Sequence, residues 1–384
     1  MKCIYDTPKM DRYELYRDTL DGLKSESRFR SIPPQRDCKD ILDLCSNDYM
    51  GLSRIDTDLQ KDFRSRFADV PFSASASRLL SLNQNIHNQL EEKLENLYGQ
   101  PALLFNSGYH ANTGIVSALN VGNTLFVADK LVHASMIDGL VMGRCQFKRF
   151  PHNDISALKK ILEKEATHRD RIVIMVESIY SMDGDKAPLR EIVELRALYD
   201  NALLYVDEAH AFGVRGEKGL GLCEELNILP DIDILIGTLG KAAYSAGAFC
   251  IAPKPLKDLF VNCARSFIFS TALPPANMAW SIVTIDKLLR SNDEREYLKR
   301  IAREVHMHLE HKDNDTPIVP YHIGDASKAI EVSRMLAASG ILALPIRRPT
   351  VPAGTERIRF SLNAALTSID IVRLFNAIDS ISHD

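Results

Sequence analysis

Polar residues that could do chemistry stand directly after short apolar runs in the middle of the chain. Asp207 and His210 lie at the end of the run 202–209 (ALLYVDEA), and Lys241 follows the run 233–237 (DILIG). Ser107-Gly108-Tyr109 follows an earlier run, ALLF. These segments offer a carboxylate, an imidazole, a primary amine and a glycine-containing turn. A strand-end aspartate such as Asp207 can cap the next helix or can pair with a cationic ligand nitrogen.

Lys241 follows a buried apolar run, where a lysine has two usual roles. Its stem can lie along the core while the ammonium reaches solvent. Alternatively, desolvation lowers the pKa of the amine, and a neutral amine can form a Schiff base with an aldehyde. A lysine, a strand-end aspartate and a phosphate-binding turn are together what pyridoxal phosphate (PLP) requires. Its aldehyde needs the amine, its ring nitrogen needs a carboxylate to stay protonated, and its phosphate needs backbone N–H donors.

The letters Asp207-Glu208-Ala209-His210 also spell a helicase motif. That interpretation needs an upstream phosphate loop of the form G-x-x-x-x-G-K-[S/T]. The Gly240-Lys241 pair lies downstream instead, is followed by Ala242, and has Leu235 where the first glycine of the loop should stand. The helicase interpretation is therefore rejected.

Short apolar runs alternate with helical patterns, which predicts how these residues are positioned. The expected strands are 102–105, 124–129, 171–178, 202–209, 233–237 and 247–252, and the expected helices include 11–30, 86–98, 155–166 and 188–200. Continuous apolar strands separated by helices predict an α/β fold with a mostly parallel sheet covered on both faces. Ligands of such sheets bind beyond the carboxyl ends of the strands, where the polar residues lie.

The pattern changes after about residue 283. A long charged helix over 281–311 is expected there, followed by a helix near 325–339, the strands ILALPI and RIRFSL, and a last helix. We therefore expect an N-terminal segment (1–45), a large domain (46–285) and a smaller α+β domain (286–384).

Composition excludes several classes of protein. The 384 residues include 47 Lys+Arg and 51 Asp+Glu, and this net charge of −4 gives no electrostatic footprint for nucleic acid or an anionic membrane. The seven cysteines have neither zinc-site nor Cys-x-x-Cys spacing, which predicts free thiols in a reducing compartment. The most apolar stretch, 234–252, contains Lys241, and we interpret it as two buried strands rather than a membrane span. The charged start of the chain does not resemble a signal peptide, so we expect a cytoplasmic protein.

Several motifs occur in the order found in one enzyme family. They are CSNDYMGLS (45–53), SRLLSLNQNIHNQLEEKLENLYGQPALLFNSGYHAN (77–112), DKLVHASMIDG (129–139), ESIYSMDGDKAPL (177–189), VDEAHAFGVRGEKGLG (206–221), GTLGKA (237–242), FSTALPP (269–275) and RIRFSLN (357–363). The chain thereby resembles the α-oxoamine synthases, a branch of the fold-type-I PLP enzymes. The resemblance implies a transferase with bound PLP that joins a small amino acid to an acyl thioester. It also implies a homodimer with active sites at the subunit interface.

The same resemblance implies roles for residues around the cofactor ring. Lys241 is the Schiff-base lysine, and Asp207 keeps the pyridine nitrogen protonated so that the ring acts as an electron sink. His210 and Ser181 contact the phenolic oxygen, and His133 lies over the face of the ring.

Residues that hold the phosphate follow from the resemblance as well. Gly108 and Tyr109 are expected to give backbone amides to the phosphate, and Thr238 is expected to add its hydroxyl. Ser270 or Thr271 is expected to reach the phosphate bound by the partner subunit.

Substrate contacts are implied for four further positions. Arg359 matches the arginine that clamps the amino-acid carboxylate by a bidentate pairing. Asn47 matches a residue near the same carboxylate, and Arg347 and Thr350 match positions next to the acyl donor.

The loosest match and the departures from the family concern substrate detail. Arg28 or Arg30 is expected either to touch a distal acyl carboxylate or to be a charge on a surface helix. The segment 73–77 reads SASAS where the family often has glycines, and Ala243-Tyr244 stands where relatives often have a glycine. None of these departures falls on a predicted catalytic group.

Within the family, Gly240 and the run Ser245-Ala246-Gly247-Ala248 favour a member that uses L-alanine and a pimeloyl thioester. Members that use glycine are the alternative, and a non-catalytic scaffold of the same fold is a second. The acyl carrier, coenzyme A or a carrier protein, is left open.

Overall fold

The computed structural model describes residues 11–32, 40–82, 85–311 and 314–382. Contacts within the chain divide it into two units. The larger unit comprises residues 46–319 and 361–371, and the smaller comprises 1–45, 320–360 and 372–384. Each unit is described by itself.

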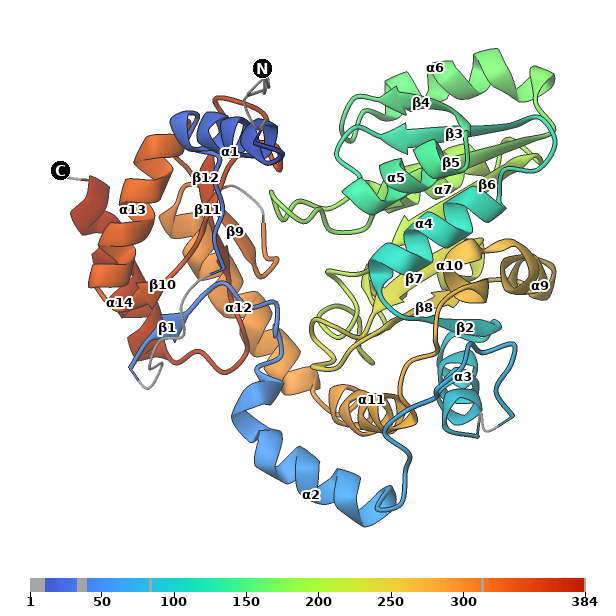
Figure 1. Cartoon of the computed structure of the whole chain (residues 1–384), viewed down its shortest axis with the longest axis horizontal. Coiled ribbons are helices and arrows are strands. Elements are labelled where there is room, and N and C mark those ends of the chain that lie inside the picture. The colour runs from blue at the N-terminus through green and yellow to red at the C-terminus, as the bar shows by residue number, and fades with distance from the viewer. Residues whose placement is uncertain (1–10, 33–39, 83–84, 312–313, 383–384) are drawn as a thin grey trace, which may run out of the picture. The chain divides into compact units, whose positions relative to one another are not determined.

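The larger unit is built on a seven-stranded sheet with the order β2-β8-β7-β6-β5-β3-β4 (Figure 1). Only β8 runs antiparallel to its neighbours, so the sheet is mostly parallel, as expected for the α/β class. The strands are β2 (Ala102–Phe105), β3 (Thr124–Asp129), β4 (Gln146–Phe150), β5 (Arg171–Glu177), β6 (Ala202–Asp207), β7 (Ile234–Thr238) and β8 (Ala248–Ile251).

Helices and short 3-10 turns connect these strands (Figure 1). The helices are α2 (Asp56–Arg66), α3 (Asn85–Tyr98), α4 (Gly108–Ala118), α5 (Ala134–Met142), α6 (Ile155–Glu165), α7 (Leu189–Arg196), α8 (Leu222–Glu225), α9 (Lys254–Cys263), α10 (Arg265–Ile268), α11 (Pro275–Leu288) and α12 (Asn292–His308). The 3-10 turns are η1 (Leu52–Ile55), η2 (Ala166–His168) and η3 (Leu229–Asp231).

Helices α4 and α5 pack closely, and this contact shapes the site. Gly139 in α5 makes the approach possible, because a Cβ there would lie 2.9 Å from Val116 Cβ and 3.0 Å from the Asn112 carbonyl oxygen. One apolar core includes Ile115 of α4, Met136 of α5 and Tyr205 of β6. The polar residues near the carboxyl ends of the strands are thus held by a dry, tightly packed frame.

In the seven-stranded sheet, the structure confirms the predicted strands and adds one. β4 was not expected, because its sequence QFKRF is largely polar, as suits a strand at the edge of a sheet with mostly exposed side chains. The stretch 234–252 forms the antiparallel pair β7 and β8, as predicted. Within the described part of the chain, no helix combines the length and apolar character needed to cross a bilayer.

The expected single helix over 281–311 is wrong, since α11 ends at Leu288 and α12 begins at Asn292. Buried side chains explain the break. Ser291 Oγ donates to the Lys287 carbonyl at 3.0 Å, and Arg295 Nη1 donates to the Leu288 carbonyl at 2.7 Å. These side chains satisfy carbonyls at the end of α11 that the next helical turn would otherwise bind.

The smaller unit contains α1 (Glu14–Ser25) and α13 (Ala326–Ala338). Its strands β1 (Leu42–Asp43) and β10 (Ile341–Leu342) pair in parallel, while β11 (Pro345–Ile346), β12 (Arg357–Ser361) and β9 (Ile318–His322) form a second sheet. The division between the units falls within β9, near the end of β12 and within α14 (Ser368–Ser382).

This division differs from the expected domains 1–45, 46–285 and 286–384. The β1–β10 pairing joins Leu42 and Asp43, within the expected segment 1–45, to the smaller unit. Helix α12 belongs to the larger unit, where Lys299 lies 3.9 Å from Glu225 and Tyr297 donates to the Leu366 carbonyl at 2.5 Å. The change of unit therefore comes near residue 320 rather than 285.

Candidate active site

Lys241 lies in the turn after β7, at the carboxyl end of the sheet. The turn is held by the Gly240 N–H, which donates to Thr238 Oγ1 at 3.2 Å, and by Thr238 Oγ1, which donates to the Gly247 carbonyl at 3.2 Å. Lys241 Nζ lies 2.8 Å from His210 Nε2. The structure thus brings the predicted amine and the predicted imidazole into hydrogen-bond contact.

Behind His210 stands Tyr49, a residue without a predicted role. Tyr49 is fully buried, and its hydroxyl lies 2.7 Å from His210 Nδ1. The same hydroxyl donates to Asn47 Oδ1 at 3.0 Å. Asn47 therefore connects to Lys241 through two intervening side chains. The signal that could have pointed to Tyr49 is its place in the quoted motif CSNDYMGLS.

Asp207 ends β6 and is 5% exposed. Its Oδ1 accepts from the Ala209 N–H at 2.9 Å, and its Oδ2 accepts from Asn112 Nδ2 at 2.8 Å. The next residue, Glu208, points elsewhere and anchors α8 by accepting from the Cys223 N–H at 2.7 Å. Of the two adjacent carboxylates, only Asp207 is thus left to serve a ligand.

Glu177 lies directly beside Asp207, because the two residues are paired in the register of β5 and β6. Burial, reinforced by the nearby Asp207 carboxylate, raises the pKa of Glu177 well above its ordinary value. A neutral Glu177 therefore adds no second negative charge directly beside the Asp207 carboxylate. Sequence reasoning assigned no role to Glu177, although it begins the quoted motif ESIYSMDGDKAPL.

His133 precedes α5 and caps it, since its Nδ1 accepts from the Ser135 N–H at 3.2 Å. The same nitrogen lies 2.7 Å from Ser135 Oγ. Partial burial lowers the pKa of His133, and the positive charge of Lys241 lowers it further, against the opposing effect of Asp207. The histidine is therefore favoured in its neutral form.

The N-terminus of α4 carries two of the predicted phosphate contacts. Ser107 caps this eleven-residue helix by accepting from the His110 N–H, and Gly108 and Tyr109 are its first residues. A Cβ on Gly108 would meet no atom within 4 Å, so there is open space beside its backbone. Exposed N–H groups at a helix N-terminus favour an anion.

Ser181 and the pair Ser270 and Thr271 also belong to the larger unit. Ser181 lies in the loop after β5, which the bridge between Ile179 and Lys186 closes. Thr271 is exposed, and its carbonyl accepts from Asn106 Nδ2 at 2.8 Å. The ligand contacts of these three residues stay predictions.

The remaining predicted substrate residues lie in the smaller unit, where some of them meet. Arg30 donates to Thr350 Oγ1 at 3.1 Å, and Arg347 donates to the Ser27 carbonyl. Arg28 instead pairs with Glu26 at 2.7 Å. Arg30, rather than Arg28, thus shares a cluster with Thr350.

Arg359 lies on β12 and is 8% exposed. Its predicted role as the carboxylate clamp, like those of the other arginines in the smaller unit, stays a prediction.

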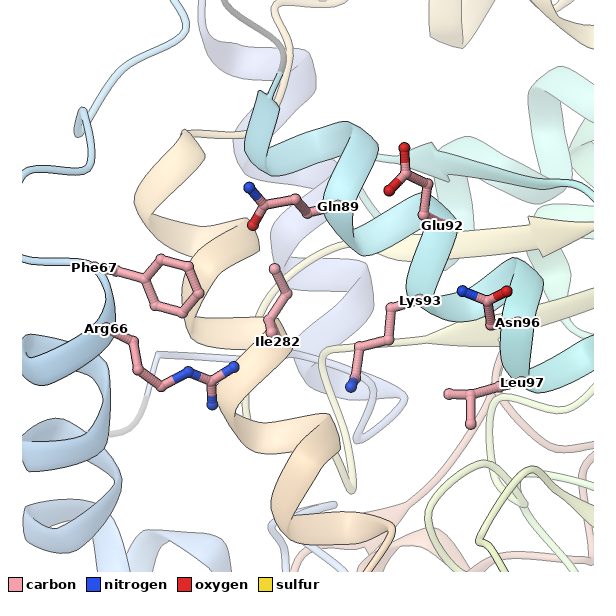
Figure 2. Close-up of a pocket in the computed structure, with 8 residues that line it drawn as sticks. All are labelled: Arg66, Phe67, Gln89, Glu92, Lys93, Asn96, Leu97 and Ile282. Atoms are coloured by element: carbon pink, nitrogen blue, oxygen red, sulfur yellow. The ribbon is translucent and has the colours of Figure 1, made fainter.

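A pocket of about 440 Å³ elsewhere in the larger unit contains none of these residues. Figure 2 shows it lined by side chains that include Arg66, Phe67, Lys93 and Ile282. Arg66 and Lys93 both pair with Asp286, so their charges are already compensated. Among the residues that the structure describes, no group of His, Cys, Asp and Glu side chains is placed to hold a metal ion.

Comparison with known proteins places this site in a family. Residues 39–378 match the family "Aminotransferase class I and II". A Haemophilus influenzae protein (strain 86-028NP) named "Putative 8-amino-7-oxononanoate synthase" is 42% identical over 379 residues, covering 95% of this chain and 99% of that protein. A Neisseria meningitidis protein (serogroup A, strain Z2491) of the same name is 43% identical over 380 residues, with the same coverage.

Solved structures agree with this placement. A serine palmitoyltransferase variant from S. paucimobilis, with a bound PLP–myriocin aldimine, has a TM-score of 0.86 and 27% identity, covering 97% of both chains. The 8-amino-7-oxononanoate synthase from Francisella tularensis has a TM-score of 0.74 and 25% identity, covering 89% of this chain and 97% of that one.

The chain belongs to the class I and II aminotransferase family and has the fold-type-I architecture of PLP enzymes. It is a PLP-dependent acyltransferase, similar to proteins that are named as 8-amino-7-oxononanoate synthases.

The described residues fit this cofactor. They supply an amine at Lys241, a buried carboxylate at Asp207, and open space at the N-terminus of α4 beside Gly108. The aldehyde, the ring nitrogen and the phosphate each find the chemical partner they need.

Proposed function

We propose that this chain condenses L-alanine with a pimeloyl thioester, carried by coenzyme A or an acyl carrier protein. The products are 8-amino-7-oxononanoate, CO₂ and the free thiol, a step of biotin biosynthesis. The observation that carries the proposal is the contact of Lys241 with His210 beside the buried Asp207 carboxylate. The choice of substrates is supported by the names of the relatives at 42–43% identity.

Each residue has a distinct task in this reaction. Bound PLP supplies an electron sink for the negative charge that develops at the substrate α-carbon. Asp207 holds the ring nitrogen of the cofactor by a charge-assisted hydrogen bond. The Lys241 amine removes and returns the proton at the α-carbon. His133 donates a hydrogen bond to the acyl carbonyl oxygen, which gains negative charge as the carbon–carbon bond forms.

The substrate ends are bound by residues that carry matching charges. We propose that Arg359 pairs with the amino-acid carboxylate and that Asn47 assists it. Arg347 and Thr350 lie beside the acyl donor in this proposal, and Arg30 is better placed than Arg28 to join them because it bonds to Thr350.

We further propose that two copies of the chain form a homodimer with shared active sites. Phe269 is a large apolar side chain of the larger unit, and it is 70% exposed. Ser270 and Thr271 follow Phe269 directly. In this proposal they reach the cofactor phosphate of the partner subunit.

The proposal is tested by turnover of alanine, glycine and serine, each with pimeloyl, acetyl, succinyl and palmitoyl thioesters. We expect the alanine and pimeloyl pair to give the highest kcat/KM, with one CO₂ released per amino ketone formed. The Lys241→Ala variant, prepared in parallel, shows how much of the measured turnover does not depend on the site. A clear preference for glycine would instead indicate a 2-amino-3-ketobutyrate CoA ligase or a 5-aminolevulinate synthase.

A further inference from the structure

Asn112 of α4 lies where three elements meet behind the site. Tyr205 and Asp207 are two residues apart on β6, so their side chains leave the same face of the sheet. Both reach Asn112: its Oδ1 accepts from the Tyr205 hydroxyl at 2.6 Å, and its Nδ2 donates to Asp207 Oδ2 at 2.8 Å. Nδ2 also donates to Ser135 Oγ of α5 at 2.9 Å. Both N–H groups of the Asn112 amide therefore donate, and its oxygen accepts. The residue is only 2% exposed.

The charge of Asp207 sets the direction of these hydrogen bonds. An ionised carboxylate can only accept, so the nitrogen of the Asn112 amide, and not its oxygen, must face Asp207. The oxygen then takes the hydrogen of Tyr205, and the second N–H points to Ser135 Oγ. Ser135 Oγ accepts a hydrogen bond from Asn112 and has its own hydrogen left to donate.

The acceptor for that hydrogen is His133. Ser135 is fully buried, and its Oγ lies 2.7 Å from His133 Nδ1. The same ring nitrogen accepts the Ser135 backbone N–H at 3.2 Å. A nitrogen that accepts from two donors carries no proton itself. The neutral ring of His133 therefore has its hydrogen on Nε2.

We propose that Asn112 is a positioning residue that couples Asp207 to His133. Its amide orients the Asp207 carboxylate and, through Ser135, keeps the proton of His133 on Nε2. Asp207 is thereby presented as an acceptor to the ring nitrogen of the cofactor, while His133 is presented as a neutral donor. The buried Asn112 amide thus fixes Asp207 as a hydrogen-bond acceptor and His133 as a donor, each toward the cofactor or the substrate.

The groups facing His133 make this control necessary. Asp207 on β6 attracts a proton to the histidine, as does Asp138 on α5, whereas Lys241 after β7 repels one. Glu177 on β5 accepts from the backbone N–H of His133. A protonated His133 would compete with the cofactor nitrogen for the charge of Asp207. Two donors directed at Nδ1 oppose that protonation.

Three variants separate positioning from packing. Asn112→Leu removes both links, whereas Ser135→Ala removes only the link to His133 and leaves the Asn112–Asp207 bond intact. The matched control is Ser117→Ala, one turn further along α4. Ser117 Oγ also joins α4 to α5, by donating to the Gly139 carbonyl at 3.0 Å, but it contacts neither Asp207 nor His133.

The first measurement is a pH titration of ¹⁵N-histidine NMR signals in the full-length protein with bound PLP, with His133 assigned from the His133→Gln variant. In wild type and Ser117→Ala we expect the Nε2–H form of His133 as the single neutral species. Ser135→Ala removes the hydroxyl donor at Nδ1 and keeps the backbone N–H, whereas Asn112→Leu keeps both donors but no longer directs the Ser135 hydroxyl toward Nδ1. In both variants we expect a mixture of the two neutral forms of His133 and a higher pKa. Unchanged His133 signals in both variants would overturn the proposal.

The second measurement is steady-state turnover of the proposed reaction. Only this measurement rests on the proposed function. We expect Asn112→Leu to lower kcat by about 10- to 100-fold, with little change in the KM for either substrate. Ser135→Ala should lower kcat less and should move the acidic limb of the pH profile upward. Equal losses in Asn112→Leu and Ser117→Ala would mean that Asn112 only packs. If alanine and pimeloyl thioester fail as substrates while the NMR result holds, the proposed function is wrong and the coupling stands.

Discussion

At the scale of single residues, a row of oriented hydrogen bonds connects Asn47 with the amine of Lys241. The Tyr49 hydroxyl has one hydrogen, and it points to Asn47 Oδ1. His210 therefore donates from Nδ1 to the Tyr49 oxygen and offers Nε2 as an acceptor to Lys241. Tyr49, which contacts Nδ1 and not the nitrogen that faces Lys241, therefore determines which ring nitrogen of His210 carries the proton.

Sequence reasoning predicted reactive groups that the structure brings together, Lys241 and His210 beside Asp207, but not the groups that orient them. Lysine, aspartate and histidine after buried strands indicated chemistry when taken together, and the family resemblance gave each of them a role. Tyr49, Asn112 and Ser135 are ordinary polar residues, and their importance comes from long-range contacts. Asn112 and Asp207, for example, lie 95 positions apart in the chain, and no local pattern reports that they touch.

The first prediction at this scale concerns Lys241. Borohydride reduction of the PLP-loaded protein, followed by peptide mapping, should attach the cofactor to Lys241 and to no other lysine. The physical reason is that Lys241 lies at the carboxyl end of the sheet and contacts His210 beside Asp207. Lys241→Ala should take up no label and should lose turnover. A label on a different lysine would reassign the site.

At the scale of elements, His152 ties together the ends of two strands and a loop. His152 Nδ1 lies 2.9 Å from Asp129 at the end of β3, and its Nε2 lies 2.7 Å from Asp185 in the loop after β5. Burial opposes the charge on the ring, but the hydrogen bonds to Asp129 and Asp185 outweigh it and raise the pKa of His152 to about 10. The loop held in this way is the one that carries Ser181.

This arrangement predicts a pH-dependent contribution to stability. The folded-state pKa of about 10 lies above the ordinary value of 6.5, so the contribution is fully present below pH 6.5 and is lost as the pH rises through about 10. We expect His152→Gln to lower the free energy of unfolding by about 1.5–3 kcal/mol at pH 6 and by less at pH 9. Urea unfolding at the two pH values measures the difference.

The control for that measurement is His168→Gln, since His168 is exposed. This variant should unfold like wild type at both pH values. A loss in His152→Gln that is the same at pH 6 and pH 9 would show that His152 acts by its shape and not by its charge.

Elements with a strong local pattern were predictable, and elements defined by distant contacts were not. The buried strands of the larger unit have continuous apolar sequences, and they formed where expected. The break between α11 and α12 contains neither glycine nor proline, because Ser291 and Arg295 end α11 through their side chains. β1 is two residues long and exists through its pairing with β10, almost 300 residues further along the chain.

At the scale of the whole molecule, the proposed dimer gives one chain a role in the other chain's site. Ser270 and Thr271 carry hydroxyls next to Phe269, whose large apolar side chain is exposed to solvent. A two-fold symmetric interface would bury the same patch on both copies. Each active site would then combine Lys241 of one subunit with Ser270 and Thr271 of the other.

Hybrid dimers test this sharing. One chain carries Lys241→Ala and the other carries Ser270→Ala with Thr271→Ala, and each homodimer should have low activity at limiting PLP. In a hybrid, one site regains an intact lysine from the second chain and intact hydroxyls from the first. After denaturation and joint refolding of equal amounts, about a quarter of all sites should be restored, because half of the dimers are hybrids with one complete site each.

A matched mixture distinguishes sharing from simple stabilisation. Lys241 and Asp207 lie in the same subunit's site, since both belong to one sheet of the larger unit. Hybrids of Lys241→Ala with Asp207→Asn should therefore regain nothing, because each site keeps one defect whichever chain provides it. Restoration in both mixtures would mean that Lys241 and Asp207 of one site come from different subunits, and restoration in neither would place Ser270 and Thr271 beside the phosphate of their own chain. Sedimentation velocity of each mixture shows whether dimers are present at all.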